Sequence, residues 1–175
     1  YAYDPVPACL TPEQQHYIKG VQANLWTEYV TNYRHVEYME LPRLAALAEI
    51  AWCEPQQKNF DDFTARLLRL IRHYRLAGYT YSRTLLRVKM QVEADTAQHA
   101  LVATLSTADN APIYYTLHGE TPTTASTRYA KPFVVKTDAT LCAAAERGGR
   151  MDQAVSRTLH FNPATACPVE VWPEP

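Results

Sequence analysis

The apolar run at residues 20–30, GVQANLWTEYV, ends in side chains that can do chemistry, because Trp26 and Glu28 stand two positions apart. An ionised Glu at the end of a buried strand must be solvated, paired with a cation, or used to bind a ligand. At the tip of a strand that opens into a pocket, an indole gives an apolar wall and a carboxylate accepts strong hydrogen bonds from a ligand. Trp26 and Glu28 are therefore candidate binding residues. The alternative is a core aromatic beside a surface acid.

Other acids and histidines in the first half have structural explanations. His35 and Glu37 lie beside a predicted helix start, where capping and orientation of the helix account for them. Glu49 lies within RLAALAEIAW, where a half-buried Glu is more often paired with an Arg, such as Arg43, than used as an acid. We expect none of these three residues to be catalytic.

The composition limits the classes of partner. The chain has 175 residues and a formal net charge of −1, with no block of like charges, so neither nucleic acid nor an anionic membrane surface is expected as a partner. No apolar run approaches the roughly 20 residues of a membrane span. The opening YAYDPVPACL lacks the charged and apolar segments of a signal peptide, and we expect the chain to be a fragment of a larger protein.

The four cysteines, Cys9, Cys53, Cys142 and Cys167, show neither a CxxC motif nor pairing with His at the spacing of metal ligands. No metal and no cofactor is predicted. Cys53 and Cys142 are expected to be buried as small apolar side chains. A Cys9–Cys53 or a Cys142–Cys167 disulfide remains an open alternative.

Two helices are predicted before residue 79. Residues 34–54 carry apolar side chains at helical spacing, which predicts a helix with one long buried face and Pro42 in an early turn. Residues 60–77 form a second apolar stripe, with Asn59 as the N-cap, acids in the first turn and Gly78 at the end. The arginines of this second helix lie mainly off the stripe, on a face expected to be solvated.

After about residue 84 the apolar period changes from helical to two. The runs HALVATL, IYYTL, FVVK, TLCAAAE and RTLHF are short, rich in strand-forming residues and separated by turn sequences. This spacing predicts a small antiparallel β-sandwich. The predicted fold class is therefore α+β, with a helical domain at 1–82 and a sandwich at 83–175.

The motifs GVQANLWTEYV and VEYMELPRLAALAEIAW together resemble the last barrel strand and last barrel helix of the family-20 glycoside hydrolases, the β-N-acetylhexosaminidases. YAYDPVP resembles the segment before that strand. The stretch IYYTLHGETPTTASTRYAKPFVV resembles the small sandwich that follows the barrel in many bacterial members. The resemblance implies the end of a (β/α)8 barrel and a connecting helix at 1–82, followed by an immunoglobulin-like or fibronectin-like sandwich.

In that family the Trp of the LWTE motif walls the pocket around the terminal N-acetylhexosamine, and its Glu binds sugar hydroxyls. The resemblance assigns these roles to Trp26 and Glu28. The substrate's acetamido oxygen attacks the anomeric carbon, while an adjacent Asp-Glu pair orients that group and protonates the leaving group. The chain has no such pair, since its adjacent acids Asp61 and Asp62 open a helix. We therefore expect no catalytic residue in this chain, and no activity of the chain alone.

The leading interpretation is the C-terminal part of a glycosidase that removes terminal non-reducing β-linked N-acetylhexosamine from glycans by substrate-assisted retaining hydrolysis. The resemblance also implies a periplasmic, cell-surface or secreted location in a bacterium. The fragment is expected to self-associate. The alternative is a stand-alone sandwich module that binds carbohydrate or protein, which an aromatic platform formed by Tyr114, Tyr115 and Tyr129 would favour. Strand alternation places Tyr114 and Tyr115 on opposite faces, so at least one of them is expected in the core.

Overall fold

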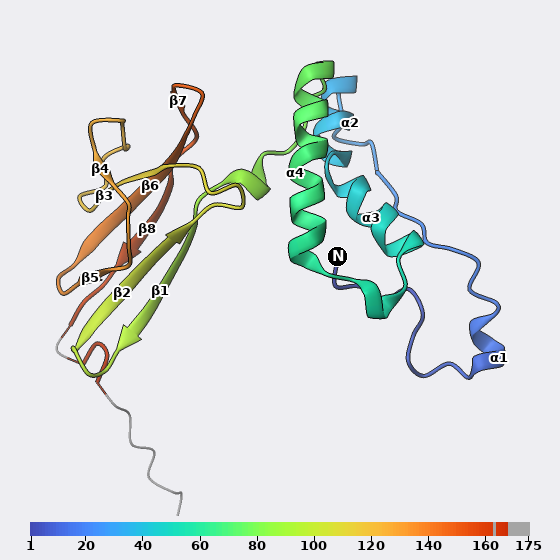
Figure 1. Ribbon diagram of the computed structural model, residues 1–175, viewed down its shortest axis with the longest axis horizontal. Helices are drawn as coiled ribbons and strands as arrows, with labels where there is room; N and C mark the ends of the chain where they lie inside the picture. The colour runs from blue at the N-terminus through green and yellow to red at the C-terminus, as the bar shows by residue number, and fades with distance from the viewer. Residues whose placement is uncertain (163, 168–175) are drawn as a thin grey trace, which may run out of the picture. The chain divides into compact units, whose positions relative to one another are not determined.

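The computed structural model describes residues 1–162 and 164–167, with helices in the first half and strands in the second (Figure 1). The chain separates into two units, Tyr1–Arg83 and Thr84–Pro175. The predicted division, after residue 82, lies one residue away. The α+β class is confirmed, and among the described residues the helical unit does not close a barrel.

The first unit holds the helices α1 (Pro12–Gln15), α2 (Tyr33–Glu40), α3 (Arg43–Trp52) and α4 (Phe60–Ala77), with a 3-10 turn η1 (Pro55–Gln57) before α4. The prediction of one helix over residues 34–54 was wrong. Leu41 leaves the helical conformation at φ −92° and ψ 133°, and α3 begins after Pro42. Proline has no backbone N–H to continue a helix and favours an extended residue before it, so the chain breaks here.

Helix α4 confirms its prediction at both ends. The Asn59 side chain accepts hydrogen bonds from the N–H groups of Asp61 and Asp62, which satisfies two donors that a helix start leaves unpaired. At the other end Gly78 adopts the left-handed conformation, at φ 77°, which glycine reaches without steric cost. The buried face of α4 consists of Phe63, Leu67 and Ile71.

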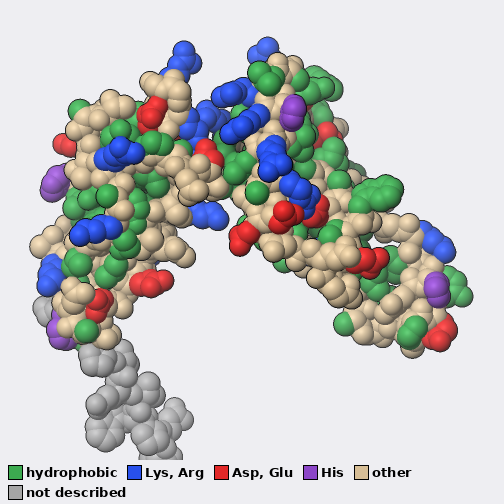
Figure 2. All heavy atoms as spheres, viewed as in Figure 1, with side chains coloured by type: hydrophobic (Ala, Val, Ile, Leu, Met, Phe, Trp, Pro, Cys, Tyr) green, Lys and Arg blue, Asp and Glu red, His purple; other side chains and the backbone are tan. Residues whose placement is uncertain are grey.

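The helices before α4 bury few of their side chains. Neither α2 nor α3 contains a buried residue, and Trp52 at the end of α3 is 90% exposed. The predicted long buried face at 34–54 is therefore absent. Hydrophobic side chains lie on the surface of this unit (Figure 2). Among the described residues, no helix combines the length and the apolar character needed to span a membrane.

The second unit begins with a 3-10 turn, η2 (Thr84–Leu86), and continues as two antiparallel sheets. One sheet has the order β1-β2-β5, and in the other β6 pairs with β3, β7 and β8, while β4 pairs with β3. Their bounds are β1 (Lys89–Asp95), β2 (Ala100–Ser106), β3 (Ile113–Thr116), β4 (Thr127–Arg128), β5 (Phe133–Val135), β6 (Ala139–Arg147), β7 (Arg150–Met151) and β8 (Val155–Leu159). The five predicted runs correspond to β2, β3, β5, β6 and β8. Strands β1, β4 and β7 were not predicted.

The core of the second unit lies between the two sheets. Leu141 and Ala143 of β6 are fully buried, and Ala103 and Leu105 of β2 belong to the same cluster. Tyr115 packs against this cluster, which confirms that one of the paired tyrosines of β3 is a core residue. The sandwich therefore closes an apolar core of its own, unlike the helices before α4.

All four cysteines are free, so neither of the two possible disulfides forms. Cys142 is buried in β6 and Cys53 is half-buried after α3, in line with their expected role as small apolar side chains. Cys9 is exposed, and Cys167 is half-buried with its Sγ 3.9 Å from Nδ1 of His99.

Candidate functional site

Trp26 and Glu28 lie in the irregular segment between α1 and α2. Both are exposed, Trp26 by 74%, and Glu28 lies in a turn that is closed by a 3.0 Å hydrogen bond from the Val30 N–H to the Thr27 carbonyl. The segment at residues 18–25 forms no strand, which corrects the element that the resemblance implied for these residues. A strand needs a neighbour for its backbone groups, and the described part of the chain provides none here.

Other aromatic side chains of the helical unit are exposed as well. Tyr3, Tyr29 and Tyr33 are exposed large side chains in the same unit. Flat aromatic faces beside a free carboxylate are suited to the apolar faces and the hydroxyls of a neutral polyol. Because Trp26 and Glu28 are both exposed, this surface presents binding groups without excluding water.

At the start of α2 the cap is Asn32, so His35 takes part through its backbone and not as a capping side chain, whereas the Glu37 side chain makes a structural hydrogen bond. Asn32 caps α2 by accepting a 3.0 Å hydrogen bond from the His35 N–H. The Glu37 carboxylate accepts a 2.8 Å hydrogen bond from the Thr80 N–H, beyond the end of α4. Glu37 therefore connects α2 to the segment that leaves the helical unit.

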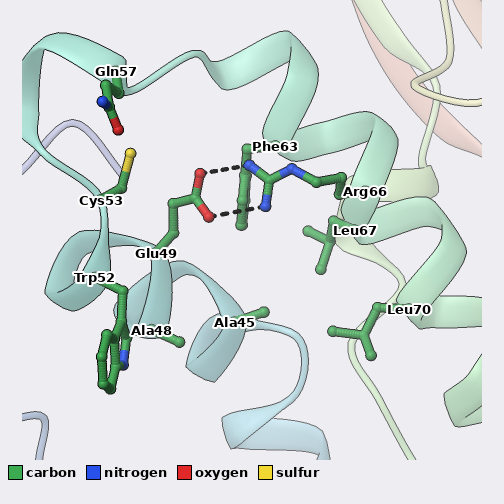
Figure 3. A pocket seen from close by; sticks show the side chains of 10 residues that line it. All are labelled: Ala45, Ala48, Glu49, Trp52, Cys53, Gln57, Phe63, Arg66, Leu67 and Leu70. Carbon is green, nitrogen blue, oxygen red and sulfur yellow. Dashed lines mark hydrogen bonds and ion pairs between the residues drawn. The ribbon is translucent and has the colours of Figure 1, made fainter.

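A pocket of about 580 Å³ lies between α3 and α4 (Figure 3), and its lining includes neither Trp26 nor Glu28. Its wall carries a bidentate ion pair, in which Arg66 Nη1 and Nη2 donate to the two Glu49 carboxylate oxygens at 2.9 and 2.5 Å. Arg66 Nε also donates to Asp62, at 2.8 Å. The pocket is lined by Ala45, Ala48, Glu49, Trp52, Cys53, Gln57, Phe63, Arg66, Leu67 and Leu70.

The prediction that Glu49 pairs with Arg43 was wrong. Arg43 instead donates to the backbone carbonyls of Tyr38 and Met39, which leaves Glu49 to pair with α4. Hydrogen bonds from Arg66 hold the pKa of Glu49 below its ordinary value, against the opposing effect of burial. Glu49 therefore stays ionised at neutral pH.

An ion cluster in the second unit was not identified from the sequence. Arg147 at the end of β6 donates to both oxygens of Asp109 at 2.6 and 2.7 Å, to the Leu86 carbonyl at 2.8 Å and to Asp152. The hydrogen bonds from Arg147 lower the pKa of Asp109. Every nitrogen of the guanidinium thus has a partner, which is the arrangement expected of a structural clamp.

The aromatic side chains of the sandwich pack on one another. The rings of Tyr115 and Phe133 stack with their centroids 4.4 Å apart, and the Tyr129 ring meets both at steep angles. All three also pack against the core cluster. Among the described residues, no group of three or more His, Cys, Asp and Glu side chains is placed to hold a metal ion.

Comparison with known proteins gives two family matches in the order of the two units. Residues 1–55 match the glycosyl hydrolase family 20 catalytic domain, and residues 92–158 match the chitobiase/beta-hexosaminidase C-terminal domain. A catalytic-domain segment followed by an accessory sandwich defines a modular glycoside hydrolase. The chain belongs to glycosyl hydrolase family 20.

Curated relatives carry names that agree with these matches. A beta-hexosaminidase of Porphyromonas gingivalis is 34% identical over 135 residues, which cover 75% of this chain and 17% of the relative. A beta-N-acetylhexosaminidase of Cellulomonas fimi is 45% identical over 67 residues, covering 38% of this chain and 14% of the relative. A beta-hexosaminidase of Vibrio vulnificus is 48% identical over 42 residues, or 24% of this chain and 5% of the relative. The chain thus spans less than a fifth of the length of each relative.

Proposed function

We propose that the whole protein is a glycosidase that removes terminal non-reducing β-linked N-acetylhexosamine residues, and that this chain supplies part of its sugar-binding site. The observation that carries the proposal is the match of residues 1–55, which include Trp26 and Glu28, to the family-20 catalytic domain. The names of the curated relatives support the same activity. The substrate is an N-acetylhexosamine-terminated glycan.

In this proposal each of the two side chains has a separate part in binding. The Trp26 indole lies against the apolar face of the pyranose and its acetamido methyl group. The Glu28 carboxylate accepts charge-assisted hydrogen bonds from sugar hydroxyls away from the scissile bond. Both side chains are exposed here, which leaves their polar and apolar surfaces free to meet a ligand.

The chemical step requires groups that we assign to the rest of the whole protein. Hydrolysis that retains the anomeric configuration through the substrate's own acetamido group needs two protein groups. A carboxylate orients the acetamido group, and an acid protonates the leaving oxygen. The two adjacent acids of the chain, Asp61 and Asp62, do not fit these roles. They form the first turn of α4, where their backbone N–H groups donate to the Asn59 cap, and the Asp62 carboxylate is paired with Arg66. The chain by itself is therefore proposed to be inactive.

A single substitution in the whole protein tests the proposed role of Glu28. Changing Glu28 to Gln keeps the size of the side chain but removes its charge, so hydroxyl binding should weaken by about 1.5 to 3 kcal/mol, the scale of a charged hydrogen bond. This corresponds to a loss of roughly ten- to a hundredfold in kcat/KM on a chromogenic β-N-acetylglucosaminide. Kinetics within twofold of the unmodified protein would return Glu28 to the role of a surface acid.

The alternative of a stand-alone binding module has less support. It requires an aromatic platform on the sandwich, whereas Tyr115 and Tyr129 pack with Phe133 against the core. Binding of N-acetylglucosamine oligomers by the chain, measured by calorimetry and lost on changing Tyr114 but not Glu28, would favour the module over the glycosidase.

The location is a further part of the proposal. We place the whole protein in the periplasm, at the cell surface or outside a bacterial cell, in keeping with a glycan substrate that is met there. Cell fractionation with an antibody against this chain would test this, and recovery in the cytoplasm alone would contradict it.

A further inference from the structure

Helix α4 lies in a part of the chain that neither family match covers. The catalytic-domain match ends at residue 55 and the sandwich match begins at residue 92, whereas α4 spans Phe60–Ala77. A helix in this position is either a linker or a part of one of the domains. A linker makes few contacts with the domains that it joins, so the contacts of α4 with residues 1–55 distinguish the two cases.

The first two turns of α4 are attached to α3 and to the first residue of the chain. Arg66 donates to both carboxylate oxygens of Glu49, whose side chain is only 14% exposed (Figure 3). The Arg66 guanidinium also lies 5.9 Å from the ring centroid of Phe63. The Tyr1 ring stacks on Phe63, with the two centroids 4.7 Å apart. Because Phe63 is buried, a residue of the catalytic-domain match thus helps to cover the buried face of α4.

The segment that follows α4 is attached to α2. The Thr80 N–H donates to the Glu37 carboxylate at 2.8 Å, and the Ser82 N–H donates to the Leu41 carbonyl at 2.9 Å. Ser82 is buried, and Leu41 is the residue at which α2 ends, where a helix leaves carbonyl groups without a partner of its own. Both ends of α4 are therefore anchored to residues of the catalytic-domain match.

Apolar side chains lie between these two anchors. Leu67 and Leu70 of α4 line the pocket together with Ala45 and Ala48 of α3 (Figure 3). Separating α4 from residues 1–55 would expose its buried stripe to water and leave the half-buried Glu49 carboxylate without its cation. Both effects oppose separation, so α4 and residues 1–55 should open as one cooperative unit.

We propose that residues 60–82 are an integral part of the catalytic domain, a clasp that holds α2, α3 and the start of the chain together. The interaction surface is the buried face of α4 with the Arg66 guanidinium, and its partner is residues 1–55 of the same chain. The catalytic domain therefore extends beyond its family match, to residue 82. This inference goes beyond the proposed function, because it does not depend on what the whole protein binds.

Limited proteolysis of the whole protein in increasing urea tests this inference. Trypsin cuts after arginine, and Arg72 is exposed in α4 while Arg43 is exposed in α3. Short pulses of trypsin, with the fragments identified by mass spectrometry, should show both bonds becoming cleavable at the same urea concentration. Cleavage after Arg72 without urea, or at a lower urea concentration than cleavage after Arg43, would show that α4 opens alone and would overturn the inference.

Substitutions on the two faces of α4 make the test specific. Arg66→Met should speed cleavage after both Arg72 and Arg43 by roughly three- to tenfold, a scale between those of exposed and buried ion pairs. Phe63→Leu, which removes the stacked ring, should act in the same direction. Arg69→Met removes an exposed arginine of the same helix and should leave both rates within twofold. An effect of the first two variants that is confined to the Arg72 bond, or no effect at either bond, would overturn the inference.

The outcomes for the inference and for the proposed function are distinguishable, because proteolysis does not require hydrolysis of a sugar. If the whole protein does not hydrolyse a chromogenic β-N-acetylglucosaminide, the proposed function fails, while joint opening of α3 and α4 still supports the clasp. If the whole protein is active but α4 is cleaved while α3 stays intact, the clasp fails and the proposed function stands.

Discussion

At the scale of single residues, the structure separates acids that hold the fold from the acid proposed to bind a ligand. Glu37 accepts a backbone N–H, and Glu49 is paired on both oxygens by Arg66. Glu28 is instead an exposed side chain beside an exposed indole. The sequence predicted the structural roles of Glu37 and Glu49 from their helical context. It did not predict the partner of Glu49, because α4 approaches α3 from 17 residues further along the chain.

The ion pair between Glu49 and Arg66 makes a prediction about pH. Because the pKa of Glu49 is lowered in the fold, the pair stabilises the helical unit fully above the ordinary carboxyl value of 4.5, and this stabilisation is lost as the pH falls through the lowered pKa. Glu49→Gln should therefore destabilise the helices at pH 7 and have little effect once the pH is below the lowered pKa of Glu49. Urea unfolding followed by helical circular dichroism measures both conditions.

The control for the pH prediction is Glu40→Gln, which removes the same charge at an exposed position of α2. It should change the stability by much less than Glu49→Gln at pH 7. Equal losses for the two variants at every pH would show that the ion pair across the pocket contributes nothing specific.

At the scale of elements, a helix or strand was predicted correctly where its own residues mark its ends and its buried face. Helix α4 carries its cap, its stripe and its terminal Gly78 in its own sequence, and the structure has all three. The break at Pro42 was missed because the apolar spacing continues across it. Strand β1 alternates exposed Lys89 and Gln91 with inward-packing Met90 and Val92, and it was missed because two large apolar side chains do not form an apolar run. Strands β4 and β7 have two residues each, which is too short for a periodic signal.

The central strand of the sandwich gives a prediction about stability. Leu141 of β6 is 0% exposed in the core cluster, so Leu141→Ala should leave a cavity and cost about 2 to 5 kcal/mol in the free energy of unfolding. Val134 of β5 is 43% exposed, and Val134→Ala should cost no more than about 0.5 kcal/mol. Urea denaturation of the chain compares them. Similar costs for the two variants would mean that the core does not lie between these sheets.

At the scale of the whole molecule, the two units bury their apolar side chains to different extents. Apart from Val134, every exposed large hydrophobic side chain in the described part of the chain lies before residue 80. The sandwich has a closed core cluster, while α2 and α3 contain no buried residue. The sequence predicted two buried helical faces because periodicity shows that a face is apolar, and it does not show what covers that face.

The uncovered surface of the helical unit predicts self-association of the chain in solution. Exposed aromatic side chains such as Trp26, Tyr29 and Trp52 favour contact between copies, because burying them removes apolar surface from water. Light scattering should show a mass that rises with protein concentration, and Trp52→Gln should reduce that rise. A strict monomer over a wide concentration range would contradict this prediction.

Hydrolysis of a chromogenic β-N-acetylglucosaminide, measured for the whole protein and for this chain at equal molar concentration, tests the central claim most directly. The claim is that the chain contributes sugar-binding side chains, Trp26 and Glu28, to an active site whose acid and acetamido-orienting groups lie elsewhere. The predicted result is turnover by the whole protein and none above background by residues 1–175. Turnover by the chain that survives repurification and depends on Glu28, or an inactive whole protein, would contradict the account.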